Sequence, residues 1–126
     1  MEQTLKDKVV LITGGARRVG AAITRKLHAA GAQVVIHYHR SAQAAQDLAA
    51  ELNAQRPGSV TPLGGDLRRV PLLGALVEAT IARHGHLDIL VNNASTFYPT
   101  RVGEITEAHW EDLMGTNLKA PLFLSQ

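Results

Sequence analysis

Cysteine is absent from the 126 residues, which excludes disulfides and thiolate metal sites and suits a reducing compartment. Thirteen basic residues against eleven acidic ones give a net charge of +2, and no Lys/Arg tract is present, so nothing indicates nucleic-acid binding. Residues 1–8 hold no apolar segment, and the longest apolar stretch, residues 70–82, is interrupted by Glu78. We therefore expect neither a signal peptide nor a membrane span, and we expect a cytoplasmic protein.

What the chain does contain is a glycine-rich turn between an apolar run and an amphipathic segment. Val9 to Ile12 has the continuous apolar character of a parallel strand that is covered on both faces. The letters T-G-G-A-R-R-V-G follow, from Thr13 to Gly20, and a helix is predicted from Val19 to Ala30. Such a turn leaves backbone N–H groups at the positive end of a helix and suits a pyrophosphate, although an ordinary strand-to-helix turn has the same pattern.

Strands and helices alternate along the rest of the chain. Further strands are predicted at residues 34–36, 59–63 and 87–91, and helices follow each of them, the last beginning near Thr106. The residues predicted to face the sheet are, helix by helix, Val19, Ala22, Ile23, Leu27 and Ala30; Ala45, Leu48, Ala49 and Leu52; Leu73, Leu76, Val77 and Thr80; and Trp110, Leu113, Met114, Asn117 and Leu118.

This alternation predicts one α/β unit over residues 1–126, a Rossmann-type doubly wound parallel sheet with strand order 3-2-1-4. Pro62 supports that order, because proline cannot donate to a central ladder and the third strand is outermost in it. The glycine turn, the residues from His37 to Ser41 and those from Asn92 to Ser95 would then meet at the carboxyl ends of the strands, where such sheets bind ligands.

The end of the second strand bears on cofactor choice. An acidic residue there binds the ribose diol of NAD, whereas a basic residue accommodates the 2′-phosphate of NADP. Here no acid is present, Arg40 follows His39, and Ser41 adds a hydroxyl. This pattern favours NADPH. The alternative is that Arg40 and Ser41 only begin a solvated helix.

The last helix holds a feature that follows from covalent structure. Pro121 has no N–H, so the carbonyl of Asn117 loses its usual helical partner and has room for a water. Asn117 also falls on the predicted apolar face, so we expect its side chain to point to the sheet and not to solvent. A catalytic role for Asn117 and a purely structural one, with Pro121 kinking the helix, remain equal alternatives.

Three further features bear on a metal site, a hydrolase or a ligand contact. The histidine pairs at 37/39 and 84/86 lack a third ligand at convincing spacing, so we expect no metal site. No G-x-S-x-G elbow follows any strand, which argues against a serine hydrolase. Phe97 follows the fourth strand, where its ring has access to a flat ligand, although a loop aromatic more commonly fills a small core.

Taken together, the motifs resemble the short-chain dehydrogenase/reductase family along the whole chain. They are the T-G-x-x-x-x-x-G turn, Gly65-Asp66-Leu67, Asn92-Asn93-Ala94 and Asn117, in that order. Three departures from the general pattern are similar to pteridine reductases: Arg18 at the middle glycine position of the turn, the letters H-Y-H-R-S from His37 to Ser41, and N-A-S-T-F-Y-P from Asn93 to Pro99.

The resemblance implies reduction of an oxidised pterin or dihydrofolate by NADPH, in an enzyme that is expected to be a tetramer. The residues implied to bind the cofactor are Gly14, Arg17, Arg18, Val19, Gly20, His39, Arg40, Ser41, Asp66, Leu67, Asn93, Ala94 and Ser95. Arg18, Ser95 and Phe97 are implied to contact the pterin, with Phe97 stacked on its ring. Asn117 corresponds to the family residue whose carbonyl holds a water in the proton relay.

One family motif is missing from the sequence. The proton donor and its partner form Y-x-x-x-K, and neither Tyr38 nor Tyr98 is followed by lysine at that spacing. We therefore expect the chain to be the amino-terminal half of such an enzyme, with the fourth strand as an edge. Two alternatives remain: a catalytically silent NADP-binding fragment, and a different short-chain reductase that acts on a ketone or an acyl thioester.

Overall fold

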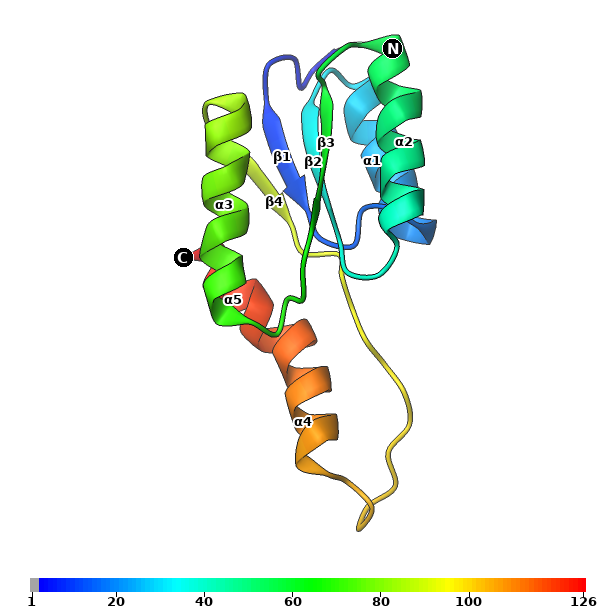
Figure 1. The fold of residues 1–126 in the computed structure, drawn as a ribbon, viewed down its shortest axis with the longest axis vertical. Helices are drawn as coiled ribbons and strands as arrows, with labels where there is room; N and C mark the ends of the chain where they lie inside the picture. The colour runs from blue at the N-terminus through cyan, green and yellow to red at the C-terminus, as the bar shows by residue number, and fades with distance from the viewer. Residues whose placement is uncertain (1–2) are drawn as a thin grey trace.

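The computed structural model describes residues 3–126, which form a parallel sheet with helices on both faces (Figure 1). The elements in chain order are β1 (Val9–Ile12), α1 (Arg18–Ala29), β2 (Gln33–Tyr38), α2 (Ala42–Gln55), β3 (Val60–Gly64), α3 (Val70–His84), β4 (Ile89–Val91), α4 (Glu107–Met114), the π-helical turn η1 (Gly115–Lys119) and α5 (Ala120–Ser125). The predicted alternation of strands and helices is confirmed.

The strand order is β3-β2-β1-β4, and every neighbouring pair is parallel. Pro62 lies on β3, opposite Ile36 of β2, so the strand without a full set of donors is at the edge of the sheet. Strand β4 forms the other edge and pairs with β1 from Val10 to Ile12. The sequence-based prediction of a Rossmann-type sheet with order 3-2-1-4 is therefore confirmed.

Alternate residues of the central strands point to opposite faces of the sheet and belong to two separate apolar layers. Val10 and Ile12 of β1 belong to the layer under α1 and α2, while Leu11 belongs to the layer under α3 and α5. Figure 1 shows the same division, with α1 and α2 on one side of the sheet and α3 on the other. The inner faces predicted for α2 and α3 are confirmed, since Ala45, Leu48, Ala49, Leu52, Leu73, Leu76 and Thr80 are all buried.

The face predicted for helix α1 is confirmed only in part, because Ile23 and Leu27 are partly buried against the apolar layer but the most buried positions are others. Its buried residues are Gly20, Thr24 and His28, whereas Val19 is 66% exposed. A small residue and two polar ones occupy the buried stripe, because Gly20 lets the helix approach the turn and Thr24 donates a hydrogen bond from Oγ1 to the carbonyl of Gly15 at 3.1 Å. Apolar spacing alone therefore misplaced the helix face by about one residue.

The final helix differs from the prediction in a second way. It is one continuous helical path in three parts, because a π-helical turn separates α4 from α5 and the N–H of Ala120 bonds to the carbonyl of Gly115, five residues back. Pro121, which has no N–H, follows directly. The wider turn changes the direction in which side chains before and after it point. Trp110 and Leu118 are 60% and 59% exposed, so they do not share a buried face.

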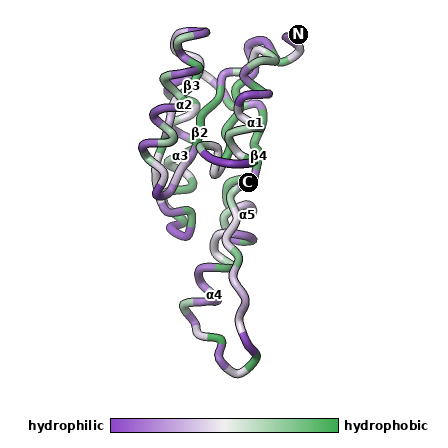
Figure 2. Tube along the Cα trace, turned by 90° about the vertical axis from the view of Figure 1, so that its right-hand side faces the viewer, coloured by the Kyte–Doolittle hydropathy of each residue, from purple (hydrophilic) through white to green (hydrophobic). Residues whose placement is uncertain are grey.

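The loop after β4 and helix α4 extend beyond the carboxyl end of the sheet. Figure 2 shows this arm as a narrow projection from the layered part of the molecule. No residue of α4 is buried, and the apolar layer resumes only at Ala120 and Leu124 of α5. None of the helices in residues 3–126 is long and apolar enough to cross a membrane.

Candidate functional site

A cleft of about 630 Å³ opens at the carboxyl ends of the strands, between the glycine turn and the arm. It is lined by every residue predicted to bind the cofactor: Gly14, Arg17, Arg18, Val19, Gly20, His39, Arg40, Ser41, Asp66, Leu67, Asn93, Ala94 and Ser95. His37, Arg68, Thr96, Asp112 and Thr116 complete the lining. The fold thus brings together segments that are far apart in the chain, while the roles of the individual residues stay predictions.

The turn between β1 and α1 is compact because its glycines touch other backbone. Gly14 has a φ of +62°, the left-handed region that favours glycine. A Cβ on Gly20 would clash with the carbonyl oxygen of Gly14, so helix α1 begins in direct contact with the turn. No residue larger than glycine fits at position 20 without moving the backbone.

The start of α1 carries unbalanced positive charge. Its N-cap residue, Arg17, makes no side-chain capping bond, and the first turn holds no acid, so the N-terminal N–H groups have no side-chain partner from the cap. Within residues 3–126 no carboxylate forms a salt bridge with Arg17, Arg18 or Arg40. This end of the cleft is suited to an anion.

Arg18 adopts a backbone conformation that is uncommon for a side chain of its size. Its φ is +51°, in the left-handed region, which costs a residue with a Cβ roughly 1–2 kcal/mol. It occupies the position in the turn where glycine would be unstrained, and it lines the cleft. Strain of this kind persists where the surrounding structure enforces it, and it is frequent at binding sites.

Thr13 and Asn93 connect the end of β1 to the segment after β4. Thr13 Oγ1 accepts hydrogen bonds from the N–H groups of Asn93 at 3.1 Å and Ala94 at 3.0 Å. The Asn93 side-chain amide donates in return to the carbonyls of Thr13 at 3.2 Å and Gly14 at 3.0 Å. The glycine turn is therefore fixed to the segment that forms the opposite wall of the cleft.

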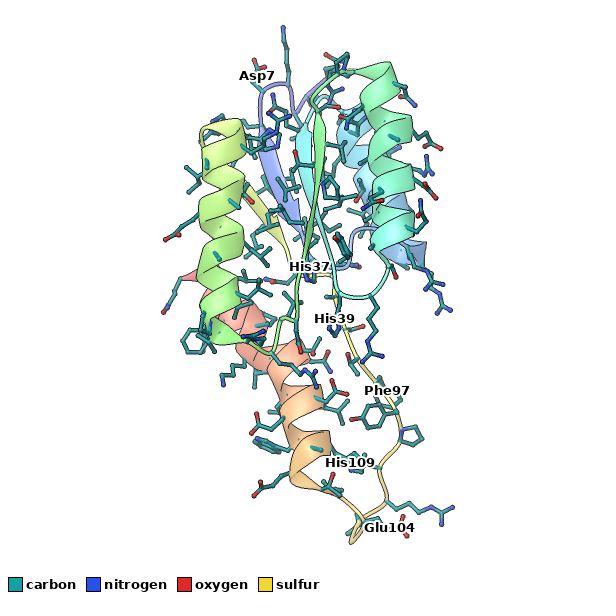
Figure 3. The ribbon with its side chains drawn as sticks, viewed as in Figure 1. Asp7, His37, His39, Phe97, Glu104 and His109 are labelled. Atoms are coloured by element: carbon teal, nitrogen blue, oxygen red, sulfur yellow. The ribbon has the colours of Figure 1, made fainter. Side chains whose placement is uncertain are left out.

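His37 makes a similar connection to the other side. It is 2% exposed, Nδ1 lies 3.2 Å from the N–H nitrogen of Gly14, and Nε2 lies 2.8 Å from the carbonyl oxygen of Gly65. Figure 3 shows its ring where the strands end, with His39 farther out toward the arm. Burial is the main cause that lowers the pKa of His37, so the ring is neutral at physiological pH.

The loop after β3 presents an ion pair. Arg68 donates to both carboxylate oxygens of Asp66, from Nε at 3.0 and 3.1 Å and from a terminal nitrogen at 2.7 Å. These bonds hold the pKa of Asp66 well below its usual range. Arg68 also lies 3.7 Å from the carboxylate of Asp112 on α4, and thereby links the loop to the arm.

Two side chains hold the loop after β4 to the last helical segment. Tyr98 donates from its hydroxyl to Asp112 at 3.0 Å. Asn117 accepts from the N–H of Thr96 at 2.9 Å and donates to the carbonyl of Thr96 at 2.7 Å. Phe97 lies between these anchor points and is 88% exposed, so its ring is accessible beside the cleft without lining it (Figure 3).

The orientation predicted for Asn117 is wrong. Its side chain is exposed and bonds to Thr96, and it does not point to the sheet. The reason is the π-helical turn, which includes Asn117 and displaces it from the face that an unbroken α-helix would give it. Its catalytic role stays a prediction.

Residues 8–126 match the family model described as short chain dehydrogenase. The chain belongs to the short-chain dehydrogenase family. Relatives include Pteridine reductase 1 of Leishmania tarentolae, which is 41% identical over 147 aligned positions that cover 92% of this chain and 51% of the relative. The short-chain dehydrogenase/reductase FrzI of Cladobotryum sp. is 35% identical over 98% of this chain and 47% of its own. Hydroxynaphthalene reductase-like protein Arp2 of Metarhizium guizhouense is 31% identical over 98% and 46%.

This short-chain dehydrogenase chain spans about half the length of the curated relatives it matches. The match includes the segments that line the cleft, because those segments all lie between residues 8 and 126.

Sequence reasoning missed several residues that shape the cleft of this short-chain dehydrogenase. The sequence places His37 and Thr13 only within motifs at the ends of strands, with no role of their own, and it does not single out Arg68. Arg68 had a usable signal, since it lies two residues after the only acid of that loop. The two bonds of His37 had none, because they join residues that are far apart in the chain.

Histidines away from the cleft have structural partners. His28 is 2% exposed and its Nε2 lies 2.8 Å from Ser59 Oγ. Ser59 donates to the carbonyl of Arg56 at 2.5 Å, so its hydroxyl proton is already used and the pair is not a nucleophile with its base. His84 lies 2.6 Å from Gln33 and 3.1 Å from Thr61, and holds α3 to the sheet.

Proposed function

We propose that this chain binds NADPH and takes part in reducing oxidised pterins or dihydrofolate by hydride transfer. The observation that carries the proposal is Arg18, a charged residue held at φ +51° on the wall of the cleft that it shares with Ser95. A glycine at this position would be unstrained, so the arginine is best explained by a contact that its side chain makes with a ligand.

The residues present fit a dinucleotide with an extra phosphate. The start of α1 has no side-chain cap, and Arg17 and Arg18 adjoin it without carboxylate partners among residues 3–126. Arg40 stands after β2 where a NAD-dependent protein has an acid. Ser41 makes no side-chain capping bond to α2, so its hydroxyl is available to a ligand. These features support NADPH over NADH.

When bound, NADPH supplies the hydride, and the residues of this chain bind and orient it. We assign the 2′-phosphate to His39, Arg40 and Ser41, and the adenine to Asp66 and Leu67. Asn93 and Ala94 border the ribose, in a position fixed by their bonds to Thr13. In this assignment the adenine, the 2′-phosphate and the ribose lie next to residues that follow β3, β2 and β4, which is their order across the sheet.

The substrate assignment rests on the segment after β4. Phe97 exposes its ring next to the cleft, where it can stack on a flat heterocycle, and Ser95 and Arg18 line the adjoining wall. The relative named Pteridine reductase 1 supports a pterin as that heterocycle. Asn117 is assigned to the proton relay through its carbonyl, with a proton donor outside residues 1–126, because no Y-x-x-x-K pair occurs within them.

The first prediction is the substrate class. NADPH oxidation should be followed spectrophotometrically with dihydrobiopterin, dihydrofolate, a ketone panel and an acyl thioester, using the protein as it is isolated and an intact-mass measurement on the same sample. We expect kcat/KM for a pterin or dihydrofolate to exceed that for every ketone by about tenfold or more. Activity confined to ketones or thioesters would contradict the pterin assignment, and a sample that binds NADPH but reduces nothing would favour a silent cofactor-binding unit.

A further inference from the structure

One imidazole spans the carboxyl end of the sheet. His37 is on β2, the strand between β1 and β3, and its two ring nitrogens reach the segments that leave both neighbours. Nδ1 faces the N–H of Gly14 after β1 at 3.2 Å, and Nε2 faces the carbonyl of Gly65 after β3 at 2.8 Å. Both contacts are within hydrogen-bond range, and the side chain is 2% exposed.

These partners determine the protonation state of the ring. The carbonyl oxygen of Gly65 can only accept, so Nε2 must carry a proton. The N–H of Gly14 can only donate, so Nδ1 must be unprotonated. The neutral Nε2–H tautomer is therefore the one form of His37 that satisfies both contacts. A second proton, on Nδ1, would set two donors against each other.

The backbone of His37 adds to the same arrangement. Its carbonyl accepts from the N–H of Gly15 at 3.0 Å, so two successive N–H groups of the glycine turn end on this single residue. On the other side, the N–H of Gly65 bonds to the carbonyl of Tyr38 at 3.0 Å, next to the bond from Nε2. The turn and the loop that carries Asp66 are thus both fixed to the end of β2.

We propose that His37 is a positioning residue that sets the distance between the glycine turn and the Asp66 loop, and that only its neutral form does so. The inference rests on the proposed function, in which these two segments bind opposite parts of one NADPH molecule. It gives His37 no contact with the reacting atoms. Protonation of Nδ1 or loss of the ring should weaken NADPH binding and leave the hydride-transfer step unchanged.

The charged groups that face His37 act in opposite directions. Burial lowers the pKa of His37 most, and His39 lowers it further, whereas the Gly65 carbonyl and Asp66 raise it. Asp66 is itself bound to Arg68, which limits its effect on the ring. Because the pKa in the folded protein is below the usual value near 6.5, the unfolded chain binds more protons as the pH falls below that value. The contribution of neutral His37 to the free energy of unfolding is therefore complete above about pH 6.5, and it decreases as the pH falls toward the lowered pKa of His37.

The test compares His37→Leu and His37→Gln with the unaltered protein by NADPH fluorescence titration at pH 7.5 and 5.5. We expect His37→Leu to raise the Kd at pH 7.5 about tenfold, the scale expected for losing buried hydrogen bonds, with kcat at saturating NADPH unchanged. His37→Gln should have a smaller effect and a weaker pH dependence than the unaltered protein. The 2′-phosphate of the cofactor and the side chain of His39 are the same in all three proteins, so they do not affect this comparison.

His28 provides the matched control. It is equally buried, at 2% exposed, and its pKa is also lowered, mainly by burial, but it bonds to Ser59 away from the cleft. His28→Leu should lower the Tm and leave the Kd for NADPH within about twofold. If both histidine variants at position 37 kept the Kd and the pH profile of the unaltered protein, the inference would be overturned.

A second measurement covers the case in which His37→Leu does not fold. Nitrogen-15 NMR of the histidine rings in the unaltered protein should show His37 as the Nε2–H tautomer at pH 7.5, and an Nδ1–H tautomer or a cationic ring would overturn the inference. An unaltered protein that binds NADPH but reduces no pterin would contradict only the proposed substrate. An unaltered protein that binds no NADPH would contradict the proposed function and this inference together.

Discussion

We propose that Arg40 selects NADPH over NADH because its guanidinium faces the cleft without a carboxylate partner in residues 3–126. Arg40 is exposed and lies directly after β2. Ser41, next to it, makes no side-chain bond to the start of α2. A guanidinium and a hydroxyl are suited to a phosphate monoester, and they offer no carboxylate to accept hydrogen bonds from the ribose diol of NADH.

Replacing Arg40 by alanine should therefore weaken NADPH more than NADH. We expect the Kd for NADPH to rise about tenfold, because a charge-assisted contact to phosphate is lost, and the Kd for NADH to change by less than about twofold. Fluorescence titration with both nucleotides measures the two constants.

The matched control for Arg40→Ala is Arg25→Ala. It removes the same charge from an exposed position on α1, where Arg25 pairs with Glu51 of α2 and does not line the cleft. It should alter neither Kd. Equal weakening of NADPH and NADH by Arg40→Ala would remove the assignment of a 2′-phosphate site.

At the residue scale, the sequence predicted which side chains line the cleft better than it predicted how they are held. The predicted cofactor residues converge because they follow the ends of parallel strands, which sequence order alone dictates. The bonds of Thr13 to Asn93 and of His37 to Gly65 depend on the relative positions of neighbouring strands. No local pattern in a single sequence encodes that geometry.

At the scale of elements, α1 and the last helical segment show where periodicity fails. The buried stripe of α1 is Gly20, Thr24 and His28, which carry little apolar signal because each is buried through backbone contact or a hydrogen bond. In the last segment, Pro121 marks a break in the hydrogen-bond pattern of the helix, and the helix widens to the π-helical turn η1 directly before it. A face drawn with one helical period therefore failed both in α4, where no residue is buried, and beyond Met114.

The bonds between Asn117 and Thr96 give a prediction for the arm. Asn117→Leu removes both of them and should loosen the segment that carries Phe97. We expect turnover of a pterin to fall about tenfold or more, since Phe97, which we propose stacks on the substrate, and the carbonyl assigned to the relay lose their position. The Kd for NADPH should stay within about twofold. Steady-state kinetics and a cofactor titration on the same preparation measure both.

Asn53 offers a control with the same chemistry in another place. Its side chain accepts from the N–H of Val60 at 2.9 Å and donates to the carbonyl of Val60 at 2.9 Å, at the start of β3. Asn53→Leu should lower the Tm without affecting turnover per folded molecule. If Asn117→Leu retained full turnover, neither the catalytic role of Asn117 nor its role in positioning the loop would stand.

At the scale of the whole molecule, the sheet was predictable because β1 and β4 are short, continuous apolar runs, β2 has an apolar centre, and turn residues separate the elements. The order β3-β2-β1-β4 followed from right-handed crossovers and from Pro62 on the outer strand. The arm was not predictable in the same way. Its position beyond the sheet depends on Asp112, Asn117 and the loop residues they bind, and Figure 2 shows how little of it packs against the layered core.

The fold brings the uncapped start of α1, Arg18 and Ser95 together around one cleft, to which we assign NADPH and a pterin in our proposal. Arg18 is the residue that distinguishes this chain from a general short-chain dehydrogenase, because glycine would adopt the positive φ of this turn position with less strain. Asp7 provides a control for strain alone. It has a φ of +66°, and Figure 3 shows it at the opposite end of the sheet from the cleft.

The most direct test is the rate of NADPH oxidation as a function of dihydrobiopterin concentration for Arg18→Gly, with Asp7→Gly as the control. Glycine adopts a positive φ without strain, so we predict that neither variant lowers the Tm appreciably and that Asp7→Gly keeps normal kinetics. Arg18→Gly should raise the KM for the pterin about tenfold or more, as expected for the loss of a charged hydrogen bond to substrate. A pterin KM unchanged in Arg18→Gly would contradict the central claim that Arg18 makes this cleft a pterin site.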